Sequence, residues 1–154
     1  MERRRRESGA AAVEFALIAP LFIALIFGIV SYGYMLSFRQ GISQAAAEGA
    51  RVFAVAPSGS PTVTSDAIAA INRSLSSYGI TCTASGTLTR SGQSVGTCTV
   101  PTAASACANN AAARCVKVEI RYSYRDHPLV PSFPGLGLTL PQTLAYDTTV
   151  QVNS

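Results

Sequence analysis

Hydrophobic and polar residues divide the chain into three zones. The first, residues 1–9, holds four consecutive arginines: Arg3, Arg4, Arg5 and Arg6. The second is apolar, and from Phe15 to Met35 it has 21 residues without a charge. About 20 such residues span the ~30 Å of hydrocarbon in a bilayer. We therefore predict one transmembrane helix over about residues 15–36, preceded by a basic leader.

The same helix is expected to continue past the membrane and to occupy residues 10–56. Beyond the apolar zone, apolar or small residues recur at spacings of four and three, on one helical face: Phe38, Ile42, Ala45, Gly49, Val52 and Ala56. This stripe predicts burial against the chain's own domain. Pro20 lacks a backbone donor and is expected to kink the helix. The segment from Pro57 to Pro61 is expected to break it.

Residues 57–154 form the third zone, which we interpret as a single extracytoplasmic domain. Apolar spacing predicts a second helix over 62–78, ended by Gly79. Strand-like alternation follows, with expected strands at 80–89, 94–101, 115–125 and 143–152. A small-residue loop is expected at 102–114 and an irregular connection at 128–141. The predicted fold class is α+β, with a long helix, a short helix and an antiparallel sheet of about four strands.

The charge distribution indicates orientation rather than nucleic-acid binding. The formal net charge is +4, but residues 57–154 contain no basic cluster. Basic residues that flank a membrane helix stay in the cytoplasm. We therefore expect residues 1–9 in the cytoplasm, and the chain after about Phe38 on the outer side of the membrane.

The cysteines agree with this orientation. All four lie in the part expected outside the cytoplasm: Cys82, Cys98, Cys107 and Cys115. An even count in a small exported domain favours disulfides. Zinc is the alternative, but the chain has no Cys-x-x-Cys pair and one histidine. Three pairings are possible, and we favour the sequence-local set, Cys82–Cys98 with Cys107–Cys115.

The sequence contains no catalytic constellation. His127 is the one histidine and lies at the end of a predicted strand. The carboxylates of the third zone have no recognisable partner set, and no glycine-rich phosphate loop precedes a helix. We predict that the protein is not an enzyme and uses no metal or other cofactor.

Glu14 is the unusual residue, because it lies at the start of the apolar zone. A carboxylate in a membrane helix costs on the order of 2.5–3.5 kcal/mol. A secretory signal peptide fits the arginines, but its apolar core is typically ~7–15 residues and contains no glutamate. That interpretation requires cleavage after Ala56. An uncleaved single-pass anchor is a second interpretation, in which the Glu14 side chain reaches the interface.

A third interpretation starts from Gly9, Glu14 and Phe15, whose spacing resembles the N-terminus of type IV prepilins. The resemblance implies that a prepilin peptidase cuts between Gly9 and Ala10. Glu14 then becomes the fifth residue of the mature chain and Phe15 the sixth. Cleavage creates an ammonium group at Ala10, one helical turn from Glu14. The Glu14 carboxylate can pair with the ammonium of its own chain or with that of a neighbouring subunit.

Further motifs narrow the resemblance. The phrase Ala46-Ala47-Glu48-Gly49-Ala50-Arg51, taken with the prepilin-like start and Pro20, resembles the TadE-like family of the tight-adherence (Tad/Flp) pilus system. The run Val116 to Tyr124 and the last strand resemble it more loosely. Length does not separate TadE-like from TadF-like proteins.

The resemblance implies a minor pseudopilin, processed by a prepilin peptidase and needed for pilus assembly or anchoring and for surface adhesion. It implies a single-pass protein of the inner membrane that can enter the pilus. Implied partners are the peptidase, the major Flp pilin, TadF- and TadG-like proteins, and the inner-membrane Tad platform. The rival hypothesis is an uncleaved, membrane-anchored periplasmic scaffold or binding domain without a filament role.

Small residues at four-residue intervals add a packing expectation. They occur as Ala12/Ala16, Ala24/Gly28 and Gly41/Ala45/Gly49. In membranes such spacing lets helix backbones approach closely. We expect these positions to contact helices of other subunits, unless they only reflect the abundance of alanine.

Overall fold

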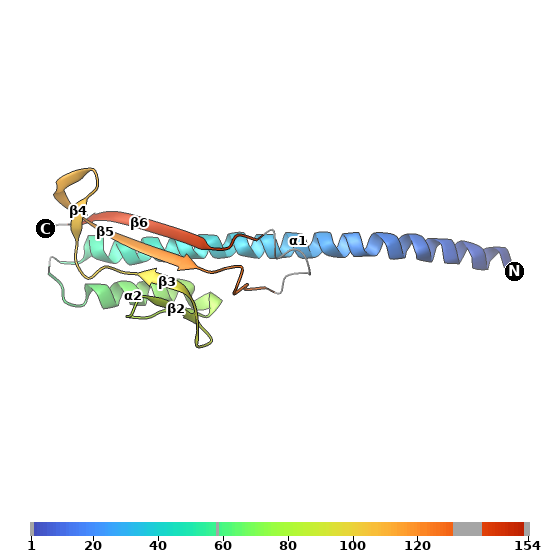
Figure 1. Cartoon of the computed structure of the whole chain (residues 1–154), viewed down its shortest axis with the longest axis horizontal. Helices are drawn as coiled ribbons and strands as arrows, with labels where there is room; N and C mark the ends of the chain where they lie inside the picture. Colours follow the sequence, from blue (N-terminus) through green and yellow to red (C-terminus); the bar gives the residue numbers. More distant parts are fainter. Residues whose placement is uncertain (1, 58, 131–139, 153–154) are drawn as a thin grey trace.

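The computed structural model describes residues 2–57, 59–130 and 140–152, with side chains from Gly9 onward. One helix, α1 (Glu2–Val55), runs the length of the molecule, and its C-terminal half carries all the other elements (Figure 1). A short helix and an antiparallel sheet follow it, so the predicted α+β class is confirmed. The helix begins at Glu2 rather than at Ala10, because arginine and glutamate are good helix formers.

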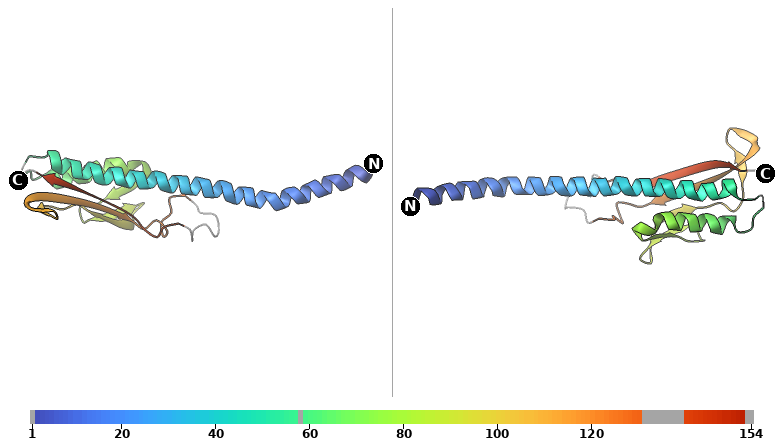
Figure 2. Two further views of the ribbon diagram at one scale, coloured as in Figure 1. Left: turned by 90° about the horizontal axis from the view of Figure 1, so that it is seen from above. Right: turned by 180° about the vertical axis from the view of Figure 1, so that it is seen from behind.

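The N-terminal half of α1 projects alone from the domain and is bent (Figure 2, left). Pro20 is the proline inside this helix. It has no N–H to donate to the carbonyl of Ala16, and its ring crowds the preceding turn. The bend is therefore what a proline in this half of the helix should produce.

Helix α2 (Val63–Leu75) lies alongside the C-terminal half of α1 and runs back along it (Figures 1 and 2). A 3₁₀ turn, η1 (Ser76–Tyr78), extends it, and Gly79 ends it with a left-handed φ of 66°. The predicted helix over 62–78 is thus confirmed, with a tightened last turn. Its buried positions are Ala67, Ala70, Ile71 and Leu75.

The sheet has six antiparallel strands among the described residues: β1 (Ile80–Cys82), β2 (Thr87–Arg90), β3 (Gln93–Thr99), β4 (Ser105–Cys107), β5 (Asn110–Tyr122) and β6 (Leu144–Val152). β5 is its centre. β3 pairs with the C-terminal part of β5, β4 pairs with its N-terminal part, and β6 pairs along the other side. β2 and β1 continue the sheet beyond β3.

The expectation of about four strands was wrong in two places. The predicted strand 80–89 is two strands, because a turn closes between them with the N–H of Gly86 donating to the carbonyl of Thr83, at 3.0 Å. Gly86 has a φ of 83°, a conformation that ends a strand. The predicted loop 102–114 contains β4 and the start of β5. Its alanines and asparagines have low strand propensity, but hydrogen bonding between the two backbones forms the hairpin in spite of this low propensity.

The core lies between the helices and one face of the sheet. The alternation predicted for 115–125 is confirmed: Val116, Val118, Ile120, Tyr122 and Tyr124 are buried, whereas Lys117 and Arg121 are exposed. The rings of Phe38 and Tyr122 meet edge to face at 4.8 Å. More of α1 is buried than the predicted stripe. Met35, Ala46, Ala50 and Phe53 are buried as well, because α1 contacts α2 on one side and the sheet on another.

Candidate functional site

The apolar N-terminal half of α1 is uncovered. From Val13 to Val30 its large apolar side chains lie exposed; Phe15 and Leu17 are both 74% accessible. α1 is long and apolar enough to cross a membrane, and its most apolar window has no buried residue in the described structure. A continuous apolar surface of this kind marks a membrane or protein interaction site.

Gly9, Ala10, Glu14 and Phe15 lie on this uncovered half. Ala10 and Glu14 are four residues apart in a continuous helix, so they share one face. Among the side chains that the structure describes, none forms an ion pair with Glu14. Arg3, Arg4, Arg5 and Arg6 lie within α1, but their side chains fall outside the described set.

The domain first covers α1 at Ser31, which is 7% exposed. Met35 and Phe38 are buried one and two turns later. An aromatic cluster marks this boundary: the ring of Tyr78 lies 6.3 Å from that of Tyr34 and 4.9 Å from that of Phe38. The hydroxyl of Tyr78 donates to the carbonyl of Ser37 at 3.2 Å. The η1 turn that follows α2 is therefore fixed to α1 near the point where the uncovered stretch ends.

The residues of the Ala46–Arg51 motif lie on two faces of α1. Three of its small members, Ala46, Gly49 and Ala50, are buried under α2 and the sheet, whereas Ala47 is exposed. Its charged members point away from the core, and the Nε of Arg51 donates to the Oε2 of Glu48 at 2.9 Å. A helical pair three residues apart contributes only about 0.2–0.5 kcal/mol.

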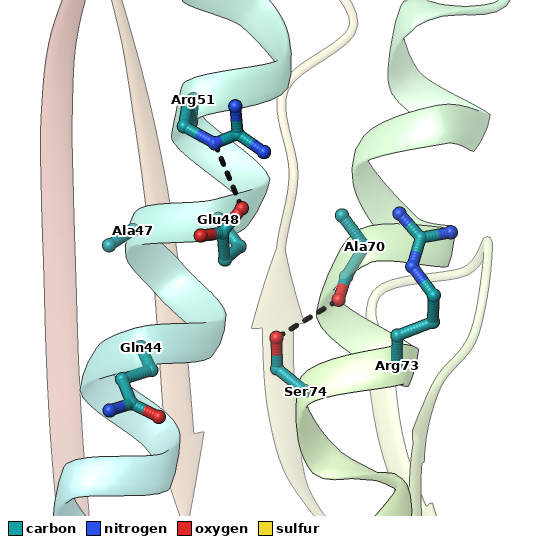
Figure 3. Close-up of a pocket in the computed structure, with 7 residues that line it drawn as sticks. All are labelled: Gln44, Ala47, Glu48, Arg51, Ala70, Arg73 and Ser74. Atoms are coloured by element: carbon teal, nitrogen blue, oxygen red, sulfur yellow. Dashed lines mark hydrogen bonds and ion pairs between the residues drawn. The ribbon is translucent and has the colours of Figure 1, made fainter.

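These two charged residues line an open groove between α1 and α2 (Figure 3). The groove has a volume of ≈620 Å³, and its other lining residues are Gln44, Ala47, Ala70, Arg73 and Ser74. Figure 3 shows Arg73 on the α2 wall, opposite the α1 residues. The hydroxyl of Ser74 donates to the carbonyl of Ala70, which leaves it no general base. The groove offers polar contacts but no nucleophile paired with a base.

The segment that contains the exposed apolar stretch is similar to a known protein family. The family model of TadE-like proteins matches residues 9–51. The family resemblance inferred from the sequence is confirmed for this segment. No curated protein and no solved structure matches the chain significantly. The matched TadE-like segment begins at Gly9 and ends at Arg51, so it holds the exposed apolar stretch and the Glu48–Arg51 pair.

The small residues of the TadE-like segment have two different settings. A Cβ on Gly41 would lie 2.6 Å from Cε2 of Tyr78, and one on Gly49 would lie 2.8 Å from Cδ1 of Ile71. Both glycines therefore admit side chains of the same subunit, and the expectation that they meet another subunit was wrong. A Cβ on Gly28 would meet nothing within 4 Å, so the Ala24/Gly28 pair is open to a partner.

The cysteines downstream of the TadE-like segment form two disulfides, Cys82–Cys98 and Cys107–Cys115. Their Cα atoms are 5.8 Å and 5.0 Å apart, within the usual range for disulfides. This is the sequence-local pairing. The first bond is buried in the core, and the second closes the β4–β5 hairpin. The described residues contain no group of three or more His, Cys, Asp or Glu side chains able to hold a metal ion.

The strand tyrosines are structural. Burial raises the pKa of both Tyr122 and Tyr124, and for Tyr122 the nearby Arg90 partly offsets it. The hydroxyl of Tyr122 donates to the carbonyl of His127 at 2.7 Å. The backbone N–H of His127 in turn donates to Ser123. His127 thus belongs to the turn after β5, a structural position.

Proposed function

We propose that this protein is a minor pseudopilin of the Tad pilus. It is made as a precursor, cut by a prepilin peptidase, and needed for pilus assembly or anchoring and for surface adhesion. The observation that carries the proposal is the family match over residues 9–51. That segment starts at the candidate cleavage residue and includes the whole uncovered apolar part of α1.

The chemistry of the first turn supports processing between Gly9 and Ala10. Cleavage leaves an ammonium at Ala10 on the same helical face as Glu14. An opposite charge nearby reduces the cost of placing the carboxylate in hydrocarbon, which is on the order of 2.5–3.5 kcal/mol for an unpaired group. A subunit whose Glu14 pairs with the ammonium of a neighbour is held at one axial stagger. The exposed stretch that follows then packs against neighbouring helices.

The arginine block and the disulfides support one orientation. Four arginines before the apolar stretch favour a cytoplasmic N-terminus. Two disulfides favour an oxidising compartment for the domain. The domain then stands in the periplasm and contacts other pilin-like subunits or the Tad platform.

Mass spectrometry of the N-terminus tests processing. In cells with the prepilin peptidase we expect the membrane-fraction protein to start at Ala10, and in cells without it at Met1. A start at Met1 in both strains contradicts the proposal.

Matched glutamate variants test assembly. Glu14→Gln should leave the protein in the membrane fraction and abolish pili, because its neutral side chain cannot pair with an ammonium. Glu119→Gln makes the same chemical change on the exposed sheet face and should leave pili intact. Normal pili in the Glu14→Gln strain would argue against the assembly role.

The second candidate is an uncleaved, membrane-anchored periplasmic scaffold or binding domain. The observation that favours it is the unbroken course of α1 from Glu2 across Gly9 and Ala10, since a peptidase must reach into this helix. It requires an intact N-terminus and predicts that Glu14→Gln has no effect on the function of the protein.

A further inference from the structure

The domain has a base, which we define as Tyr34, Tyr78, Leu129 and Val130. Tyr34 belongs to α1 and is 39% exposed, and its ring meets that of Tyr78 edge to face. Leu129 is half-buried and packs on the core, two residues after His127, whose carbonyl accepts from Tyr122. Tyr122 in turn contacts Phe38. Tyr34 and Tyr78 thus lie close to the point where the uncovered stretch of α1 ends, and Leu129 is linked to them through His127, Tyr122 and Phe38.

The length of that uncovered stretch is short for a membrane. Glu14 and Ser31 are 17 residues apart in the sequence, or ~26 Å along a helix that rises ~1.5 Å per residue. The hydrocarbon of a bilayer is ~30 Å thick. With Glu14 at one hydrocarbon boundary, the other boundary falls near Tyr34, which is past the first residue that the domain covers.

Other placements of the helix keep the overlap. A tilt or the bend in α1 shortens its projection on the membrane normal and moves the far boundary further into the domain. If the near boundary lies at Gly9 instead, Ser31 sits ~33 Å along the helix, ~3 Å above the hydrocarbon. The headgroup layer on each side is ~5–7 Å thick, so Ser31 lies inside it, and Tyr34, ~8 Å above the hydrocarbon, lies at its outer edge.

The chemistry of the base suits the headgroup layer. Tyrosine is enriched there because its ring is apolar and its hydroxyl polar, and Tyr32 is exposed just below Tyr34. Arginines lie close by. Arg39 is exposed one turn beyond Met35, Arg90 donates to the carbonyl of Pro128, and Arg125 donates to that of Leu140. Guanidinium groups at this level can meet lipid phosphates.

We propose that the base of the domain docks into the headgroup layer of the lipid bilayer on the side of the membrane where the domain lies. The bound surface is phospholipid, contacted by Tyr34, Tyr78, Leu129 and Val130 and by the arginines around them. The inference rests on the membrane insertion of α1 in the proposed function. It adds that the domain contacts the membrane surface for as long as α1 remains inserted in the bilayer.

Tryptophan scanning tests the proposal, because the chain contains no tryptophan. The full chain would be reconstituted in phosphatidylcholine–phosphatidylglycerol vesicles, with bromine atoms placed on the lipids either near the headgroup or near the bilayer centre. Tyr34→Trp and Tyr78→Trp should lose most of their emission to the shallow bromines. Phe22→Trp should lose most of its emission to the deep bromines. Val55→Trp, at the far end of α1, should be quenched by neither.

Two outcomes separate this inference from the function on which it rests. If Phe22→Trp is quenched but Tyr78→Trp is quenched only by aqueous acrylamide, α1 inserts and the docking proposal is overturned. If Phe22→Trp is not quenched by lipid bromines, membrane insertion itself fails and the docking proposal falls with it. Leu129→Trp gives an independent reading of the base if Tyr78→Trp does not fold, as judged by circular dichroism and intact disulfides.

Discussion

The ring of Tyr78 packs directly on the backbone of Gly41. A Cβ on Gly41 would lie 2.6 Å from the Cε2 atom and 3.2 Å from the Cζ atom of that ring. The ring cannot move aside easily, because it also contacts Phe38 and its hydroxyl is bonded to Ser37. This contact joins the end of α2 to α1 at the base of the domain.

Gly41→Ala should therefore destabilise the domain. Overpacking typically costs 1–3 kcal/mol, and the better helix propensity of alanine returns up to about 1 kcal/mol. We expect a net loss of about 1–2 kcal/mol in the free energy of unfolding. Urea titration of the full chain in detergent, followed by near-ultraviolet circular dichroism, measures it. Gly33→Ala is the matched control, since a Cβ there meets nothing within 4 Å; an equal loss in both would refute the packing explanation.

Asn72 clamps the first strand to α2. Its Nδ2 donates to the carbonyl of Cys82 at 3.1 Å, and its Oδ1 accepts from the N–H of Cys82 at 2.6 Å. Asn72→Ala should cost about 1–3 kcal/mol, because each bond contributes about 0.5–1.5 kcal/mol. Asn72→Asp keeps the acceptor and loses the donor, so its urea midpoint should fall between those of wild type and the alanine variant. A wild-type midpoint for Asn72→Ala would contradict the clamp.

The two disulfides should differ in their effect on stability. Loop-closure entropy gives about 3 kcal/mol for the longer loop, Cys82–Cys98, and about 2.5 kcal/mol for Cys107–Cys115. Serine replacement of the first pair also buries two hydroxyls, since Cys82 and Cys98 are 2% and 1% exposed. The Cys82/Cys98 double serine variant should thus be the less stable of the two in urea. The opposite order would mean that the β4–β5 hairpin, not the core bond, limits unfolding.

Stability should decline in alkali because of Tyr122 and Tyr124. Burial raises the pKa of both in the folded protein above the ordinary value of 10.0. The unfolded chain therefore loses these protons first. Their contribution to stability is complete below pH 10 and is lost as the pH rises through the folded-state pKa. Tyr122→Phe with Tyr124→Phe should flatten this decline in urea midpoint, whereas Tyr146→Phe on the exposed part of β6 should not.

Much of the fold follows from patterns that report burial. The uncharged run after Glu14, the helical spacing from Phe38 to Gly49, and the alternation of Val116, Val118 and Ile120 each reflect one buried or one apolar surface. The structure has the same cysteine pairing that was favoured for sequence proximity. These features depend on local sequence, so the sequence could predict them.

The missed features depend on backbone geometry or on contacts between distant elements. The turn at Gly86 interrupts a strand-like composition, and the β4–β5 hairpin forms from alanine and asparagine. Gly49 lies in the predicted buried stripe, but nothing local shows that either Gly41 or Gly49 leaves room for a side chain of another element. Their role becomes visible only when Tyr78 of η1 and Ile71 of α2 pack against α1.

The course of α1 has a mechanical consequence. The same helix that carries Glu14 also carries Phe38 into the core, so its uncovered half is a rigid continuation of the domain. A torque or pull on the domain reaches Glu14 directly, and only the bend near the middle of the uncovered half can absorb part of it. Rotation of the domain about the helix axis therefore turns the face that bears Glu14 as well, reduced only by the part that the bend absorbs.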